Sequence, residues 1–546
     1  MKKKIIALML ALAMMLTVLA GCGNIGVVEG GENGGGENAV VSDPTKASIT
    51  VATWDGGLGS KWLENAAVLF EEKYKDATNF EEGKTGVEVN IVASRSFDGS
   101  AMAFTPLTHD IYFVEAVDYF AMINNRQLAD ISDVMTTPLT AYGEDGTIAD
   151  KLDPTLNAYL TSIDGKYYAV PFYETYYSFA YDLDLWDAKS FYIAANGGWT
   201  NASGDLAAGP DGAAGTGDDG LPATYAEFGR LITRILDSDV LPFVTAGNGQ
   251  EYVANLLYQM WADYEGAEQM LLNYTFDGTA TDLIDVAADG TVTELADTPI
   301  TIENGYMLQK QAGRYAVLQF CNDILLSSDN NYKIIDTHIN AQKSFVRGGI
   351  ANDQPIAMIV EGSWWENEAK EALKDLEDGG YERHNYAVMP SPHATEEQIG
   401  QTPTWLAMSN SYGFVASNCD NMALAKEFMK FLHTDANLCA FTQEVNMTRA
   451  LNYELSEEQI AGLSTYCQSI LALKENGNVI YPVSLVDEVN NNNIMFAAYT
   501  WAWQTNINGY EFKNPWLYFK DEADTSVINY FNGQYENFKT KWSAIF

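Results

Sequence analysis

Hydrophobic positions that alternate or recur at helical spacing organise the first part of the chain into strands followed by helices. Residues 47–54 alternate and are rich in β-branched side chains, and a glycine turn leads from them into 60–77, where apolar residues recur at helical spacing. Residues 87–92 and 110–115 predict further strands, and 116–132 predict a helix. Strands alternating with helices indicate an α/β lobe whose ligands gather at the carboxyl ends of the strands.

The rest of the pattern predicts a second lobe of the same kind. Residues 165–186 form a long aromatic stretch with too little helical period for a helix, so we interpret it as a strand that crosses between lobes. Helices are predicted at 222–238, 251–264, 313–328 and 420–433, and extended segments at 354–362, 382–390 and 405–417. The expected domains are a signal at 1–21, a tether at 22–46, lobe one at 47–173 with about 410–450, lobe two at 174–409 and a C-terminal helical region at 451–546.

The first residues indicate export and lipid anchoring. Three lysines precede a short apolar stretch that ends in Leu19-Ala20-Gly21-Cys22, which resembles a bacterial lipoprotein signal. The resemblance implies cleavage before Cys22 and acylation of its sulfur. The glycine-rich segment that follows lacks period and large apolar residues, as is typical of a flexible tether. We therefore expect a lipid-anchored protein on the outer face of the bacterial cytoplasmic membrane.

Charge and cysteine usage exclude several classes of site. The chain carries 31 Lys and Arg against 74 Asp and Glu, a formal net charge of −43, and nucleic-acid binding needs the opposite sign. The acidic excess indicates a solvated surface. Neither the cysteines nor the five histidines show zinc-type spacing, and we favour buried free thiols over disulfides. The cysteines other than Cys22 are Cys321, Cys419, Cys439 and Cys467.

Five elements in order resemble the extracellular solute-binding proteins of bacterial ABC importers, the family that includes maltose-binding and other sugar-binding lipoproteins. The elements are SITVATW, HDIYFVEAVDYFAMINNRQLADIS, GKYYAVPFYETYYSFAYDLDLW, IAMIVEGSWW and YAVMPSP with the later ALAKEFMKFL. The resemblance covers about 47–435 and weakens beyond. It implies an α/β fold of two lobes, each a mixed sheet flanked by helices, joined by hinge strands. It also implies a monomer that presents a carbohydrate to the transmembrane subunits of an ABC permease, without a required cofactor.

Aromatic side chains at the ends of predicted strands are candidates for sugar stacking. A sugar ring offers an apolar C–H face to an aromatic plane, and its hydroxyls need polar partners. Of the adjacent tryptophans after 356–362, Trp364 matches the family position and is predicted to stack, whereas Trp365 is predicted to pack into lobe two. Trp54, which ends the first strand, and its neighbour Asp55 are further candidates.

Other candidate contacts come from several segments. Glu115 ends the third predicted strand and Asp118 follows it, where they can bind hydroxyls or favour a helix N-terminus. The remaining candidates lie in the two predicted crossings and near the C-terminus: Tyr173, Glu174, Tyr176, Tyr177, Trp405, Tyr412, Trp501 and Trp503.

The acidic turn 209–220 is a candidate calcium site. Asp211, Asp218 and Asp219 lie on a glycine-rich loop, and calcium binds several carboxylate and carbonyl oxygens of flexible loops. The spacing does not match the EF-hand, and a solvated acidic loop is the alternative.

Two other functions fit parts of the pattern. A secreted glycoside hydrolase would use two carboxylates as acid and base, but no motif places such a pair at a fixed separation. A binding protein for a peptide or another polar solute would keep the fold and change the ligand. The crossing segments favour a hinged binding protein over an enzyme.

Overall fold

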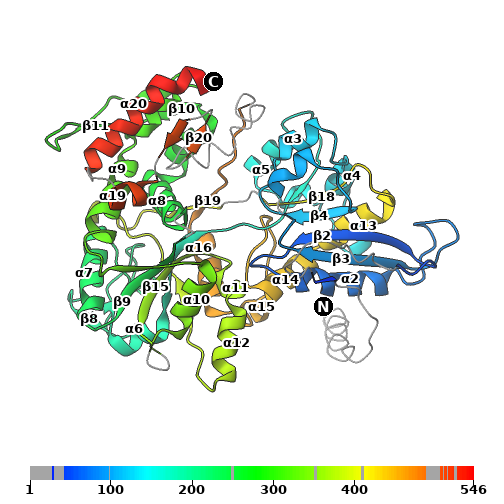
Figure 1. Ribbon diagram of the computed structural model, residues 1–546, viewed down its shortest axis with the longest axis horizontal. Helices are drawn as coiled ribbons and strands as arrows, with labels where there is room; N and C mark the ends of the chain where they lie inside the picture. The colour runs from blue at the N-terminus through cyan, green and yellow to red at the C-terminus, as the bar shows by residue number, and fades with distance from the viewer. Residues whose placement is uncertain are drawn as a thin grey trace.

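The computed structural model describes most of the chain, and Figure 1 shows that it forms two lobes joined by crossing segments. The described residues are 28–29, 42–97, 99–247, 251–349, 353–407, 411–486, 505–507, 510–512, 514–521 and 526–545. Cys22, Trp501 and Trp503 lie outside them.

Lobe one is built on a mixed sheet. Its strands lie in the order β1 (Val28–Glu29), β3 (Val87–Ser94), β2 (Ala47–Trp54), β4 (Ile111–Val114), β18 (Tyr412–Val415) and β5 (Val170–Pro171). Strands β1 to β4 are parallel, whereas β18 runs antiparallel to both β4 and β5. The helices of this lobe are α2 (Lys61–Lys73), α3 (Tyr119–Asn124), α4 (Ser132–Thr136), α5 (Pro154–Thr161), α13 (Met422–Leu432) and α14 (Asp435–Val445).

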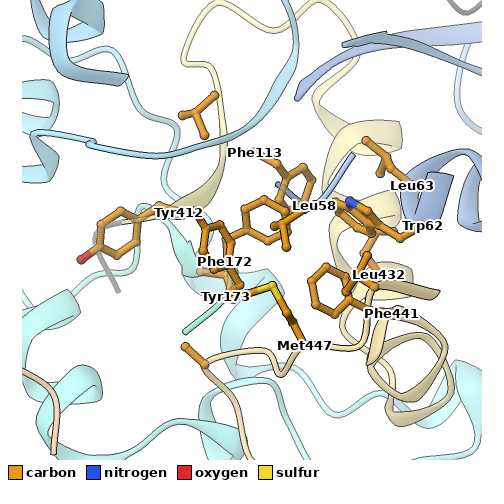
Figure 2. Packing of buried hydrophobic residues seen from close by; sticks show 14 of the residues in the cluster. Leu58, Trp62, Leu63, Phe113, Phe172, Tyr173, Tyr412, Leu432, Phe441 and Met447 are labelled. Carbon is orange, nitrogen blue, oxygen red and sulfur yellow. The ribbon is translucent and has the colours of Figure 1, made fainter. Parts of the chain in front are cut away.

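An aromatic cluster holds α2 against this sheet. The apolar stripe of α2 buries Trp62, whose ring lies 5.4 Å from Phe113 on β4, 5.2 Å from Phe172 after β5 and 5.2 Å from Phe441 on α14. Figure 2 shows these four rings grouped together, with Tyr412 pointing away from them. Aromatic edge contacts of this kind add to the stabilisation from burial. The cluster joins elements that are more than 300 residues apart in the sequence.

Lobe two contains a second mixed sheet. Its order is β14 (Tyr332–Ile335), β9 (Leu241–Ala246), β15 (Ile356–Gly362), β6 (Tyr177–Asp182) and β16 (Tyr386–Val388). Strand β9 is parallel to its neighbours β14 and β15, and β6 is antiparallel to β15 and β16. The flanking helices are α6 (Leu183–Lys189), α7 (Tyr225–Leu236), α8 (Glu251–Thr275), α9 (Ala312–Gln319), α10 (His338–Arg347), α11 (Trp365–Glu368), α12 (Lys370–Asp378) and α16 (Thr465–Asn476).

Two predicted elements are shorter than expected. The extended stretch predicted for 165–186 is divided into β5 and β6, and it ends before α6 because the Asp182 carboxylate accepts a hydrogen bond from the Leu185 amide (2.9 Å) and caps that helix. The helix predicted for 116–132 is also wrong over much of its length. Helix α3 ends at Asn124, and Arg126 then adopts a left-handed backbone (φ 57°) that stops it.

The C-terminal region packs largely on lobe two. Helix α16 lies against β16, where the Ser469 hydroxyl accepts a hydrogen bond from the Val388 amide (3.0 Å). Figure 1 shows α20 (Val527–Ile545, red) lying across lobe two beside β10 (Gly278–Ala280) and β11 (Ile284–Val286). The other described elements here are α15 (Glu457–Ala461), β17 (Thr404–Leu406), β19 (Asn478–Ile480), β20 (Thr505–Ile507), β21 (Tyr510–Phe512) and α19 (Pro515–Asp521). No helix in the described part of the chain is long and apolar enough to cross a membrane.

Candidate functional site

The turn after β2 places Trp54 at the junction of the lobes. A Cβ atom at Gly56 would lie 1.9 Å from the Trp54 ring, so this ring lies directly across Gly56, where only a glycine leaves room for it. Trp54 is partly buried and packs against the core of lobe one, and Asp55 beside it is exposed. The strand end therefore places the ring over the Gly56 backbone at the carboxyl end of β2.

Trp364 occupies the corresponding place in lobe two. Its ring lies across Gly362, where a Cβ atom would be 2.0 Å away, and it makes edge contacts with Tyr177 (5.2 Å) and Tyr252 (5.9 Å). Trp364 is partly buried, whereas Trp365 is fully buried. Trp365 packs among the rings of Phe345 on α10, Tyr386 on β16 and Tyr466 on α16. The residues that follow β15 thus place Trp364 at the junction of the lobes and Trp365 in the core.

Trp54 and Trp364 contact neighbouring glycines of the same turn. Gly57, next to Gly56, contacts Trp364 from the other lobe, because a Cβ atom at Gly57 would lie 3.0 Å from the Trp364 Cδ1 atom. The Asn367 side-chain amide also donates a hydrogen bond to the Gly57 carbonyl oxygen. The structure therefore brings Trp54 and Trp364, which are 310 positions apart in the sequence, to successive residues of one turn.

Ionisable groups of lobe two lie close behind Trp364. Glu361 is 1% exposed and accepts hydrogen bonds from the Gln342 side chain (3.1 Å) and the Gly362 amide (3.2 Å). Burial, helped by the nearby negative charge of Glu368, raises the pKa of Glu361 to about 8. A buried carboxyl group at a junction of lobes is therefore protonated over much of the neutral range.

Glu368 interacts with charged side chains of both lobes. It accepts a hydrogen bond from Gln342 (2.8 Å) and lies 3.4 Å from the His338 ring, a contact that raises the pKa of His338. Burial alone would raise the pKa of Glu368, but the hydrogen bonds from His338 and Gln342 lower it overall, and the charge of Arg95 in lobe one adds to this effect. Glu368 is thus held as a carboxylate, and a cation of the other lobe adds to this effect.

The carboxylates predicted after the third strand lie in lobe one. Asp118 caps α3 by accepting a hydrogen bond from the Ala121 amide (3.0 Å), which is the helix N-terminal role considered for it. Glu115 is partly buried, and its backbone carbonyl accepts a hydrogen bond from the Gly99 amide (2.9 Å). Ala116 between them has a left-handed backbone (φ 53°). Their roles toward a ligand stay predictions.

The candidates in the crossing segments are interior residues. Glu174 is 0% exposed, and its carboxylate accepts hydrogen bonds from Thr448 (2.6 Å), Tyr481 (2.7 Å) and Lys474, all from the C-terminal part of the chain. The rest are Tyr173, Tyr176 and Tyr177, Trp405 in an edge contact with Tyr176 (6.1 Å), and Tyr412 stacked on Tyr119 (5.6 Å). Except for Tyr177, which touches Trp364, these side chains are packed in the protein, and their roles toward a ligand stay predictions.

The acidic turn uses its carboxylates locally. Asp218 accepts a hydrogen bond from the Asp211 amide (2.9 Å), Asp219 from the Gly215 amide (2.7 Å) and Asp211 from the Ala213 amide (2.8 Å). Among the described residues, no group of three or more His, Cys, Asp or Glu side chains is arranged to hold a metal ion. Calcium binding stays a prediction.

The cysteines in the described part of the chain are free. Cys321, Cys439 and Cys467 are buried, Cys419 is partly buried, and none of the four is in a disulfide. Burial raises the pKa of all four thiols, to about 11 for Cys439 and about 12 for Cys467. Thiols with raised pKa values are poor nucleophiles at neutral pH.

Comparison with known proteins identifies the family. A family model described as bacterial extracellular solute-binding protein matches residues 62–437, more than half of the chain. The chain belongs to this family. The match confirms the resemblance inferred from the five ordered elements, and this family is one of extracellular binding proteins. A search of curated proteins finds no match.

Solved structures support the same fold. The GacH receptor of Streptomyces glaucescens, solved unliganded and with acarbose, shares 14% identity over 91% of this chain and 98% of its own, with a TM-score of 0.52. RafE from Streptococcus pneumoniae in its apo form shares 12% identity over 91% and 100%, and RafE in complex with raffinose 12% over 90% and 100%, both with a TM-score of 0.50. These likenesses confirm the α/β fold with two lobes.

Three residues of the junction were not found from the sequence. The sequence pattern places Gly57 only in a turn, and Tyr252 and Asn367 lie in polar stretches at helix starts that carry no motif. Tyr252 reaches Trp364 through packing within lobe two, Asn367 lies three residues after Trp364, and only Gly57 meets Trp364 through the contact between the lobes. A second glycine after a strand-ending tryptophan is the one local signal that points to a close approach.

Proposed function

We propose that this solute-binding protein captures a carbohydrate, most simply an oligosaccharide, between its two lobes and delivers it to the transmembrane subunits of an ABC permease. The anchor in this proposal is the acylated Cys22 on the outer face of the cytoplasmic membrane. Binding alone is its task, so the proposal includes no chemical step.

The observation that carries the proposal is the pair Trp54 and Trp364. Each ring belongs to a different lobe, is held across a glycine and keeps a partly exposed surface. A pair of fixed aromatic faces at one turn suits the C–H faces of a saccharide, and the rigid seats reduce the entropy lost on binding. Solved proteins of similar fold whose titles name raffinose and acarbose lend support to a saccharide ligand.

Polar groups around the pair suit the hydroxyls of a sugar. Asp55 is an exposed carboxylate next to Trp54, and Arg95 is an exposed guanidinium of the same lobe near Glu368. Carboxylates accept hydrogen bonds from hydroxyls, and guanidinium groups donate them. A ligand with both apolar faces and many hydroxyls matches this combination better than an apolar peptide does.

A thermal-shift screen tests the proposal. The purified protein is melted with a panel of oligosaccharides that includes raffinose and acarbose, and with a peptide panel in parallel. A ligand at 100 times its Kd adds about 2.7 kcal/mol to the free energy of unfolding, so a matching saccharide raises the melting temperature measurably. Glycerol at equal concentration controls for general osmolyte effects.

Titration calorimetry and product analysis complete the test. We expect saturable binding of the saccharide that gives the largest shift, with the sugar recovered unchanged. Stabilisation by peptides but by no saccharide would refute the carbohydrate proposal, and release of shorter sugars would favour the glycoside hydrolase.

A further inference from the structure

The lobes touch where the turn of lobe one meets the start of α11. A Cβ atom added at Gly57 would lie 3.0 Å from the Trp364 Cδ1 atom and 3.3 Å from its Cβ and Cγ atoms. Carbon atoms normally pack at about 3.5–4.0 Å. A side chain at position 57 therefore fits only if Trp364 of lobe two moves away from the backbone of lobe one.

The backbone of Gly57 does not itself require a glycine. Gly59, two residues on, has a left-handed φ of 66°, but Gly57 is not among the glycines with positive φ. The φ angle at 57 therefore does not require a glycine, and the three atoms nearest to an added Cβ atom all belong to Trp364 of the other lobe. The position separates the effect of lobe contact from that of local folding.

Polar contacts continue the contact between the lobes over residues 57–59. The Asn367 amide donates to the Gly57 carbonyl oxygen, and the Lys370 ammonium group lies 3.3 Å from the position of a Cβ atom at Gly59. Both groups come from the segment that starts with Trp364. The contact between lobes is thus a matched surface, with an apolar part at Trp364 and a polar part after it.

We propose that Gly57 is a positioning residue that sets how closely the two lobes approach, and through this the spacing of Trp54 and Trp364. The proposal rests on the proposed function, in which both rings contact one saccharide. A side chain at 57 pushes Trp364 away, widens the space between the rings and removes the Asn367 hydrogen bond. A ligand then contacts one ring well and the other poorly.

The experiment compares Gly57→Leu with Gly533→Leu. Gly533, on α20, also lacks a positive φ and is exposed, and a Cβ atom added there would have no other atom within 4 Å. Small-angle X-ray scattering is recorded without sugar and with the saccharide that most stabilises the parent protein. Calorimetry measures the affinity, and a melt reports folding. Asn367→Leu is a second variant that removes only the polar contact.

We expect Gly57→Leu to increase the radius of gyration and to raise the Kd at least about tenfold, or about 1.4 kcal/mol, with a cooperative melt like that of Gly533→Leu. Asn367→Leu should act in the same direction with a smaller effect. Unchanged scattering in both conditions would refute the steric claim, and changed scattering with unchanged affinity would refute the positioning role. If no saccharide binds the parent protein, the proposed function fails, and the sugar-free scattering still decides whether Gly57 sets the approach of the lobes.

Discussion

Single glycines determine how the large aromatic residues lie at the lobe junction. Trp54 and Trp364 each cover a glycine of their own lobe, and a Cβ atom at either glycine would lie within 2.0 Å of the ring. The rings are therefore held by close contact with the backbone rather than by surrounding side chains alone. Both tryptophans remain partly exposed, whereas Trp365 is fully buried.

Truncation of the tryptophans should separate binding from stability. We expect Trp54→Ala and Trp364→Ala each to weaken saccharide binding at least about tenfold, because buried aromatic anchors commonly cost about 2 kcal/mol or more on truncation. Trp365→Ala should lower the free energy of unfolding by about 3–5 kcal/mol, since it removes a core aromatic side chain. Calorimetric titration and thermal melts of the three variants measure both effects.

The pattern across the three variants is the control. Trp365→Ala should retain affinity under conditions where it is folded, and Trp54→Ala should melt cooperatively. If Trp364→Ala bound normally and melted far below the parent, Trp364 would be a core residue and the stacking proposal would be wrong.

Glu361 should make stability depend on pH. Its pKa is raised from 4.5 to about 8 in the folded protein, so above pH 4.5 the unfolded chain loses the proton while the folded protein keeps it. The free energy of unfolding should therefore fall as the pH rises from about 5 to about 8, by at most about 1.4 kcal/mol per pH unit. Urea unfolding at several pH values measures this slope.

The variant Glu361→Gln isolates the contribution of this carboxyl group. Glutamine resembles the protonated acid and does not titrate, so the variant should gain stability relative to the parent between pH 5 and pH 8. Other buried acids such as Asp263, whose pKa burial raises to about 7, act equally on both proteins and cancel in the comparison. Parallel pH profiles for parent and variant would contradict the assignment.

At the scale of elements, local pattern predicts strands well and long-range packing poorly. The strand predicted at 47–54 is β2 with the same bounds, because alternation and β-branching are local properties. Trp405 is a candidate from its place on a crossing segment, yet β17 pairs with β19 and buries it at 2% exposure. That pairing joins residues more than 70 positions apart, and no local pattern contains it.

The contacts at the lobe junction likewise could not be predicted from local sequence pattern. Trp54 and Trp364 could be chosen from strand ends and the family resemblance, whereas their common contact with Gly56 and Gly57 could not. Glu174 has the sequence position of a hydroxyl-binding carboxylate, but its partners come from the C-terminal region, where the resemblance weakens. A carboxylate on a crossing segment has the same sequence pattern whether it binds a ligand or a neighbouring helix.

Metal removal tests the calcium prediction for the turn 209–220. If calcium joins the carboxylates of Asp211, Asp218 and Asp219, chelator should lower the melting temperature and added calcium should restore it, because an ion that binds only the folded state adds stability. Differential scanning calorimetry with elemental analysis measures both. An unchanged melt with no ion found would leave the hydrogen bonds of the turn as the complete account of these residues.

For the whole molecule, charge and hydropathy limit how it can be held at a membrane. The net charge of −43 opposes binding to anionic lipid surfaces, and no helix among the described residues can span a bilayer. The proposed anchor is the acylated Cys22 of the N-terminal segment. Acyl chains contribute about 0.8 kcal/mol per buried CH₂, and two signals are needed for stable anchoring.

Changing Cys22 should therefore release the protein. In cells that produce Cys22→Ala, we expect the protein to move from the membrane fraction to the soluble fraction, because neither charge nor a spanning helix of the described residues replaces the lipid. The matched control is Cys419→Ala, which changes a partly buried thiol elsewhere and should stay in the membrane fraction. Immunoblots of washed membranes and mass spectrometry of the N-terminal peptide measure the outcome. A Cys22→Ala protein that remains bound as firmly as its parent would show that another part of the chain holds the membrane.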